Sequence, residues 1–123
     1  MSIQIAGGCF CGSIRYAFED GAYATANCHC TMCRRTSAAP FVPWIVVPKE
    51  HFRYTDGTPK VLNSSQHGTR YFCADCGTPL ACENDSHADV IDITICSLDA
   101  PEVIIPEHEV YLDTRLPWST ATE

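Results

Sequence analysis

The chain has 123 residues, the size of one ordinary domain. Hydrophobic residues make up 46% and charged residues 19%, which excludes bulk disorder. Eight basic against 15 acidic residues give a formal net charge of −7, which argues against binding to nucleic-acid phosphates. No apolar run approaches the roughly 20 residues that cross a bilayer. We therefore expect a single domain over residues 1–123, with neither nucleic acid nor membrane as a partner.

Short segments separated by glycine and proline predict a mainly-β fold with little helix. The first predicted strand covers residues 13–18, where Ile14, Tyr16 and Phe18 point to one face. The apolar, β-branched run 41–47 predicts a second strand, in which Pro43 favours an edge position or a bulge. Further strands are predicted over residues 69–72, 90–95 and 110–112, and one short helix over residues 30–37.

Nine cysteines are the unusual feature of the composition. Their odd number leaves at least one unpaired in any intramolecular disulfide scheme. Residues 1–8 lack the basic and apolar regions of a secretory signal. We therefore expect a reducing, cytoplasmic location, where clustered cysteines indicate metal binding or catalysis rather than disulfides.

Seven of the cysteines fall into three tight groups. The groups are Cys9/Cys11, Cys28/Cys30/Cys33 and Cys73/Cys76. Two thiolates on one Zn²⁺ each lie about 2.3 Å from the metal, so the chain between them must turn tightly. A glycine directly after such a pair can adopt the positive φ that closes the turn, and Gly77 follows Cys76 in this way.

These groups can be divided between a four-ligand and a three-ligand metal site. Cys9/Cys11 with Cys73/Cys76 would form a closed, structural four-cysteine zinc site, and the triplet would keep one open position, as catalytic zinc requires. Disulfides or unliganded thiols are the alternative for the pairs. The alternative for the triplet is a second closed zinc site. Its fourth ligand would then be His29, His108, Cys82 or Cys96.

Several residues near these groups have expected structural roles. His29, between two triplet ligands, is expected to point away from their metal. Cys82 and Cys96 are expected to be small buried residues, and Arg70 is expected to balance the charge of the four-cysteine site. Trp44 and Trp118 are expected in the core or in the wall of a cleft.

Several motifs occur together in a fixed order along the chain. They are Gly-Gly-Cys-Phe-Cys-Gly-Ser-Ile-Arg-Tyr, Cys-His-Cys-Thr-Met-Cys-Arg-Arg, Phe-Cys-Ala-Asp-Cys-Gly-Thr-Pro-Leu, Ser-Leu-Asp, and a late His with Pro-Trp. With these motifs, residues 7–118 resemble the family of glutathione-dependent formaldehyde-activating enzymes and centromere protein V. The resemblance implies a zinc-bound β-tent fold and carbon–sulfur lyase activity, which joins glutathione and formaldehyde to S-hydroxymethylglutathione or cleaves the adduct.

The resemblance also implies the same two zinc ions per chain. Its structural ligands match Cys9, Cys11, Cys73 and Cys76, and its catalytic ligands match Cys28, Cys30 and Cys33. Glutathione is an anion, so a negatively charged protein needs local positive charge to bind it. Arg34 and Arg35, next to the triplet, are the candidates for substrate binding, with solvated arginines as the alternative. A non-catalytic, zinc-stabilised binding module is the alternative to an enzyme.

Overall fold

The computed structural model describes residues 3–119 and confirms the mainly-β fold class. Its strands are β1 (Gln4–Gly8), β2 (Arg15–Glu19), β3 (Thr25–Cys28), β4 (Val42–Pro48), β5 (Phe52–Asp56), β6 (Lys60–Asn63), β7 (Gly68–Phe72), β8 (Pro79–Asn84), β9 (Val90–Thr94) and β10 (Glu109–Val110). Strands β2, β4, β7, β9 and β10 overlap the five predicted strands.

The described part of the chain has one α-helix, α1 (Thr31–Ser37), where the sequence predicts it. The short 3₁₀-helices are η1 (Lys49–His51), η2 (Asp85–His87), η3 (Ile95–Ser97), η4 (Pro101–Val103) and η5 (Leu112–Thr114). No helix within residues 3–119 combines the length and the apolar character needed to cross a membrane.

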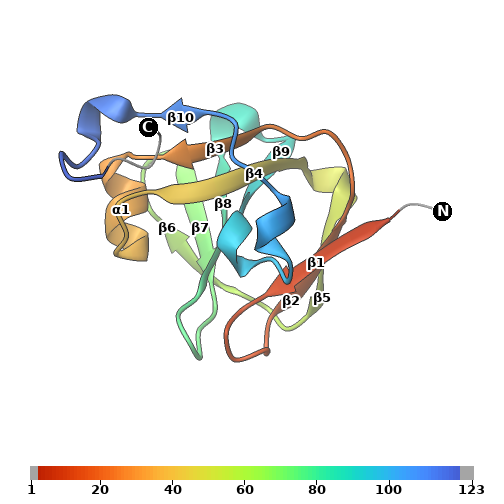
Figure 1. The fold of residues 1–123 in the computed structure, drawn as a ribbon. Coiled ribbons are helices and arrows are strands. Elements are labelled where there is room, and N and C mark those ends of the chain that lie inside the picture. The colour runs from red at the N-terminus through yellow and green to blue at the C-terminus, as the bar shows by residue number, and fades with distance from the viewer. Residues whose placement is uncertain (1–2, 120–123) are drawn as a thin grey trace.

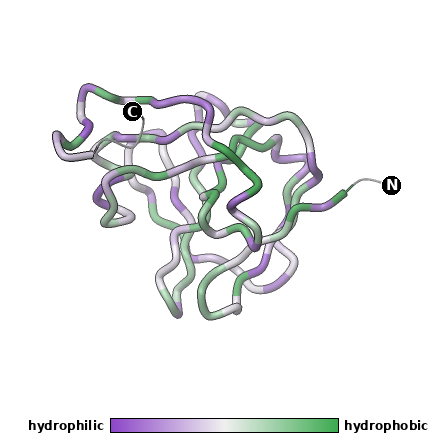
Figure 2. The backbone as a smooth tube through the Cα atoms, in the orientation of Figure 1, coloured by the Kyte–Doolittle hydropathy of each residue, from purple (hydrophilic) through white to green (hydrophobic). Residues whose placement is uncertain are grey.

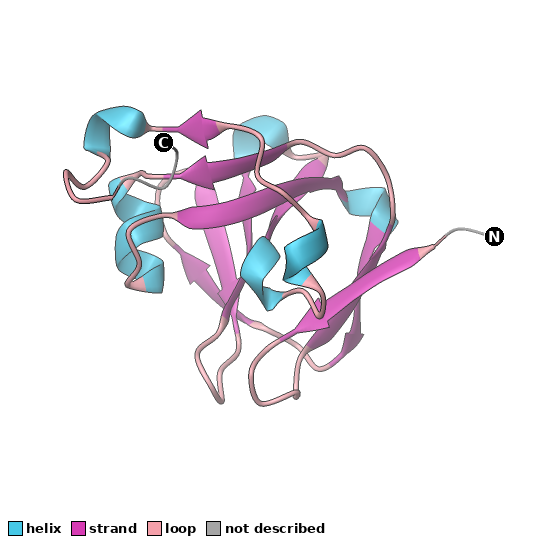
Figure 3. Ribbon diagram, in the orientation of Figure 1, coloured by secondary structure: helices cyan, strands magenta, loops and turns pink. Residues whose placement is uncertain are grey.

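The strands form two sheets (Figures 1 and 3). The smaller sheet has the order β1-β2-β5, and both of its pairings are antiparallel. The larger has the order β10-β3-β4-β9-β8-β7-β6, and only its β10–β3 pairing is parallel. Helix α1 follows β3 directly and lies beside the ends of β3 and β4 (Figure 1).

One apolar cluster lies between the two sheets. Ile14, Tyr16 and Phe18 are at most 4% exposed, which confirms the face predicted for the first strand. They pack in the same cluster as Ile45 of β4 and Ile93 of β9. Hydrophobic and hydrophilic stretches are interleaved along the tube in Figure 2, as expected where strands bury one face more than the other.

Pro43 does not place the whole strand at an edge of the sheet, but it lies in the part of β4 that has no β9 partner. Strand β4 is central, between β3 and β9. Pro43 faces Asn27 of β3, whose backbone N–H instead donates to His108 O. The pairing of β4 with β9 begins only at Trp44. Neither neighbouring strand needs an N–H donor at position 43. The missing N–H of Pro43 therefore costs the sheet no hydrogen bond, and the proline is tolerated.

The Ser-Leu-Asp motif joins the smaller sheet to the rest of the molecule. Ser97 Oγ lies 2.6 Å from the Tyr16 hydroxyl of β2. Leu98 forms an isolated antiparallel bridge with Gly7 of β1. Arg15 donates two hydrogen bonds, of 2.9 and 2.5 Å, to the carboxylate of Asp99. The three contacts fix the strands that lead into and out of the Cys9/Cys11 loop.

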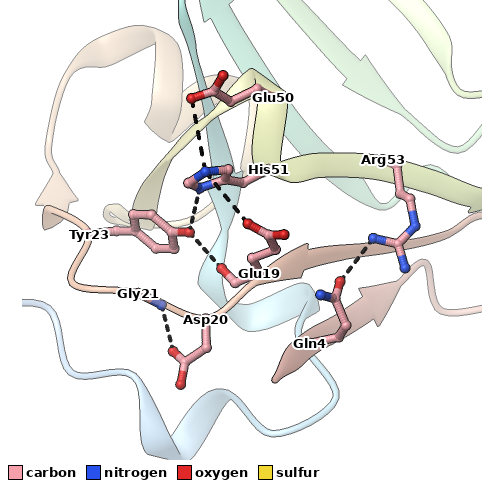
Figure 4. Close-up of polar contacts among 8 residues, drawn as sticks. All are labelled: Gln4, Glu19, Asp20, Gly21, Tyr23, Glu50, His51 and Arg53. Atoms are coloured by element: carbon pink, nitrogen blue, oxygen red, sulfur yellow. Dashed lines mark hydrogen bonds and ion pairs between the residues drawn. The ribbon is translucent and has the colours of Figure 1, made fainter. Parts of the chain in front are cut away.

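A second set of polar contacts joins the end of β2 to η1, which directly precedes β5 (Figure 4). The Tyr23 hydroxyl donates to Glu19 O at 2.6 Å and lies 3.0 Å from His51 Nδ1. His51 Nε2 in turn lies 3.5 Å from the Glu19 carboxylate. In the same view, Arg53 donates to Gln4 Oε1 across the small sheet.

Candidate metal centres

Two tight loops bring the first four cysteines together. Cys9 and Cys11 lie in the loop between β1 and β2, and Cys73 and Cys76 in the loop between β7 and β8. Gly77 has φ of +83°, which confirms the predicted turn, and its N–H donates to Cys73 O at 2.9 Å. The loop between β1 and β2 turns in the same way, since Gly12 also has φ of +83° and its N–H donates to Cys9 O.

The four sulfurs have the spacing of a tetrahedral metal site. All four lie within 4.8 Å of one another. Cys9 Sγ and Cys11 Sγ are 3.6 Å apart, and Cys11 Sγ and Cys73 Sγ are 3.8 Å apart. Four sulfurs placed 2.3 Å from one zinc ion would be separated by about 3.8 Å. This four-cysteine cluster therefore fits zinc, and because its two loops come from different sheets, it joins the sheets.

Backbone amides and hydroxyl groups surround these sulfurs. The N–H groups of Ile14 and Cys76 donate to Cys9 Sγ and Cys73 Sγ at 3.2 and 3.5 Å. Hydrogen bonds from the Thr78 hydroxyl and amide lower the pKa of Cys76 to about 6, which favours the thiolate that a metal requires. Thr78 Oγ1 also accepts from Phe10 N, so it joins the two loops.

Ser13 is a further neighbour that sequence reasoning missed. Its Oγ lies 3.2 Å from Cys11 Sγ and 3.4 Å from Cys73 Sγ. Hydroxyl groups near metal-binding sulfurs carry no spacing signature. The one clue in the sequence is that Ser13 and Thr78 each lie two residues after a loop cysteine.

The cysteine triplet forms a second cluster at the start of α1. Cys28 ends β3, Cys30 is the N-cap of α1, and Cys33 lies in its first turn. Their sulfurs lie within 4.8 Å of one another. Cys33 N donates to Cys30 Sγ at 3.3 Å. The side chains of Cys28 and Cys33 are 7% and 4% exposed, whereas Cys30 is half-buried, so the cluster opens on the Cys30 side.

No fourth ligand completes the triplet within residues 3–119, since no other Cys, His, Asp or Glu ligand atom lies within 4.8 Å of all three sulfurs. His29 points away, as predicted, and its Nε2 lies 2.6 Å from Glu109 Oε1. Cys82 packs against the cluster as a half-buried residue. Cys96 is exposed, so the expectation that it is buried is wrong.

Arg70 of β7 lies against the triplet rather than the four-cysteine cluster, which corrects the expectation from sequence. Its Nη2 donates to Cys33 Sγ at 3.5 Å and its Nη1 to Thr36 Oγ1 at 3.2 Å. The guanidinium carbon lies 5.8 Å from the centre of the Trp44 ring. The Cys28 thiol and the Arg70 guanidinium hold the pKa of Cys33 well below its usual range. Arg70 is distant from the triplet in sequence, so only the fold reveals this contact.

Arg34 and Arg35 line a cleft of about 400 Å³ beside α1, together with Leu116 and Trp118. Neither arginine side chain forms a hydrogen bond or an ion pair with any residue between 3 and 119. Trp118 is 69% exposed and forms part of the cleft wall, whereas Trp44 is 7% exposed and packs with Cys28 and Cys33. The two tryptophans therefore occupy the two expected kinds of position.

Fold and site together define a mainly-β protein with two cysteine clusters that could hold metal ions. The family model of the glutathione-dependent formaldehyde-activating enzymes matches residues 4–114. The chain belongs to this family. Among solved structures, a Rhodobacter sphaeroides protein is similar, with 18% identity and a TM-score of 0.70 over 85% of this chain and 99% of that one. A comparison with curated proteins finds no match.

Proposed function

We propose that this chain is a zinc-dependent carbon–sulfur lyase that acts on a thiol–aldehyde adduct of the S-hydroxymethylglutathione type. Two zinc ions per chain are proposed, one structural in the four-cysteine cluster and one catalytic in the triplet. Membership of the family supports the glutathione and formaldehyde chemistry.

The observation that carries the proposal is the difference between the two clusters. The four-cysteine cluster has the full ligand number of structural zinc, whereas the triplet has three sulfurs. The triplet also has a half-buried member, Cys30, which leaves it accessible from one side. Three protein ligands with one accessible side are typical of catalytic zinc rather than of a structural site.

The reaction needs an ionised thiol close to an aldehyde carbon. Zinc, when bound, supplies an open position that favours the thiolate form of an incoming thiol. In the overall reaction the sulfur–carbon bond forms, the carbonyl π bond breaks, and the proton lost from sulfur ends on oxygen. The reverse reaction cleaves the same bond and returns the thiol and the aldehyde, so no oxidant or reductant is required.

In this proposal, arginine side chains hold the anionic substrate and balance the charge of the triplet. Arg34 and Arg35 are the proposed partners for the carboxylates of glutathione, since both line the cleft beside α1 without a partner of their own among residues 3–119. Arg70, which donates to Cys33 Sγ, offsets the negative charge of the triplet sulfurs. Trp44 covers the buried side of the triplet.

A reducing compartment such as the cytoplasm is the proposed location. All nine cysteines are free thiols, and both clusters need their cysteines reduced to hold metal. Glutathione is also kept reduced in such a compartment.

Metal analysis and thiol titration test the proposal. The purified protein should contain two zinc ions per chain. After replacement of the metal by cobalt, glutathione should change the sulfur-to-cobalt absorption saturably, and C30S should abolish this change. Glutathione should bind about tenfold or more weakly to a variant in which Arg34 and Arg35 are both changed to glutamine.

Arg53→Gln is the matched control, because Arg53 lies on the smaller sheet and donates to Gln4. It should bind glutathione as the wild type does. One inert metal ion per chain, with no response to any thiol, would contradict the enzyme and favour the zinc-stabilised binding module.

A further inference from the structure

A separate cavity opens on the Arg70 side of the triplet. Its volume is about 310 Å³, and we call it the Arg70 cavity. Its lining includes Thr36, Trp44, Leu62, Arg70 and Phe72. Arg70 and Thr36 are hydrogen-bonded to each other, and Arg70 contacts Cys33. Arg70 therefore links the cavity to Cys33 of the proposed catalytic cluster, and the cavity shares no lining residue with the cleft of Arg34 and Arg35.

Two hydrogen bonds hold the Arg70 side chain, and its other N–H donors have no partner among the described residues. A guanidinium has five N–H donors, and Arg70 uses two of them, on Cys33 and Thr36. Its Nε is buried without a hydrogen-bond partner among the described residues. Nη1 and Nη2 each keep one further N–H, and a carboxylate accepts well from two neighbouring N–H groups of a guanidinium. The ring of Trp44, whose centre lies 5.8 Å from the guanidinium carbon, packs near Arg70.

Most of the remaining lining is apolar. Leu62, Phe72 and Trp44 present carbon surface to the cavity, and Arg70 is the single charged residue that residues 3–119 contribute to its lining. A cavity of this kind selects a ligand with an apolar body and one negative charge. Formaldehyde adds only one carbon and one oxygen to a thiol, so the formaldehyde unit alone would leave the cavity almost empty.

We propose that the Arg70 cavity binds the apolar, carboxylate-bearing part of a substrate, with Arg70 as the residue that determines specificity for the carboxylate. This inference rests on the proposed function, because it makes the cavity part of the same site. It extends the substrate class from glutathione and formaldehyde to adducts in which one partner is a hydrophobic carboxylic acid.

Trp44 provides the readout for a direct binding test. The chain has two tryptophans, so Trp118→Phe leaves Trp44 as the single tryptophan, in the wall of the cavity. The zinc-loaded W118F protein is titrated with 3-phenylpropionate and with 3-phenylpropan-1-ol, which differ in the carboxylate. The acid should change Trp44 fluorescence saturably, with a Kd about tenfold or more below that of the alcohol.

Variants at Arg70 test whether this residue causes the preference for the acid over the alcohol. R70Q should bind acid and alcohol alike, and R70K, which keeps the charge but not the planar fork, should keep only part of the preference. R53Q is the matched control and should keep all of it. If R70Q does not fold, the comparison of the two ligands on the W118F protein still decides. Equal affinity for acid and alcohol, or no binding of the acid, overturns the proposal.

The same titration is then repeated with two derivatives of 3-phenylpropionate, one bearing a thiol and one bearing an aldehyde. It shows whether the thiol or the aldehyde substrate carries the carboxylate. The partner that uses the cavity should bind more tightly than 3-phenylpropionate. Glutathione binding to the cobalt-loaded wild type is measured in parallel. If glutathione binds but acid and alcohol do not differ, the inference on the cavity fails and the proposed function stands. If glutathione does not bind, the proposed function itself fails.

Discussion

His29 Nε2 lies 2.6 Å from Glu109 Oε1, and this pair fixes the segment between two triplet cysteines to strand β10. The side chain of His29 is 1% exposed. The other carboxylate oxygen of Glu109 accepts a hydrogen bond of 2.7 Å from Asn27. One carboxylate thus contacts Asn27 Nδ2 on β3 and His29 Nε2 just after it, and it helps to set where Cys28 and Cys30 lie.

Replacing Glu109 by alanine should destabilise the fold. Both His29 and Asn27 would lose a buried partner, at a cost of about 1–3 kcal/mol for each unsatisfied group. The midpoint of urea denaturation should fall accordingly, and cobalt absorption from the triplet should change. Glu107→Ala is the control, since the Glu107 side chain is exposed and should leave both measurements unchanged. Equal midpoints for the two variants would contradict this role.

The two clusters should differ in their effect on folding. Cys73 is 1% exposed and lies in the cluster between the sheets, so C73S should unfold the protein or lower its stability severely. C28S should keep the β-sheet circular dichroism and one metal ion per chain, and lose thiol binding. Circular dichroism and metal analysis measure both outcomes. Equal unfolding by the two variants would contradict the division into a structural and a catalytic site.

Gly77→Ala should lower stability through the backbone alone. Gly77 has φ of +83°, and a Cβ built there meets no heavy atom within 4 Å. The cost is therefore conformational, roughly 1–2 kcal/mol, rather than steric. Gly77→Asn should cost less, because asparagine tolerates this region better. Denaturation midpoints compare the variants, and an alanine variant as stable as the wild type would show that the positive φ is not needed.

Asp92 gives a pH dependence with a defined sign. Burial, followed by the nearby charge of Cys33, raises the pKa of Asp92 to about 6. An acid whose pKa is higher in the folded state stabilises the fold at low pH, and the contribution is lost as pH rises through the folded pKa. Wild-type stability should therefore fall relative to that of Asp92→Asn, by about 1 kcal/mol between pH 5 and 7.5.

The test compares urea midpoints of wild type and D92N at both pH values. Asp89→Asn is the control, because Asp89 is exposed. The urea midpoint of this variant should differ from that of the wild type by the same amount at both pH values. A difference between wild type and D92N that does not change with pH would contradict the prediction.

The strands with a strong pattern were predictable from sequence, and those without one were not. Ile14, Tyr16 and Phe18 alternate because their large side chains all enter the same core cluster. Strand β6 (Lys60–Asn63) is exposed at every position, so no burial pattern marks it. Strand β8 begins at Pro79, a residue more typical of loops. Strands β1 and β3 were also missed, since their short segments lack a clear alternation. Strand β5 was missed as well, although Phe52 and Tyr54 alternate there with Arg53 and Thr55.

The cysteine clusters were predictable because metal ligands must be close in space, and tight turns make most of them close in sequence. Arg70 could not be placed in the same way. It is 37 positions from Cys33, and only the order β4-β9-β8-β7 in the larger sheet brings it across to α1. The role of Thr78 as the hydroxyl between two loops also depends on this long-range arrangement.

The two clusters differ in the length of chain that must be ordered before they exist. Cys28 and Cys33 are five positions apart, so one turn of chain suffices to gather the triplet. Cys11 and Cys73 are 62 positions apart, and their meeting requires closure of a long loop and assembly of both sheets. During folding, the triplet can thus capture metal early, whereas metal in the four-cysteine cluster marks a chain whose distant loops have already met.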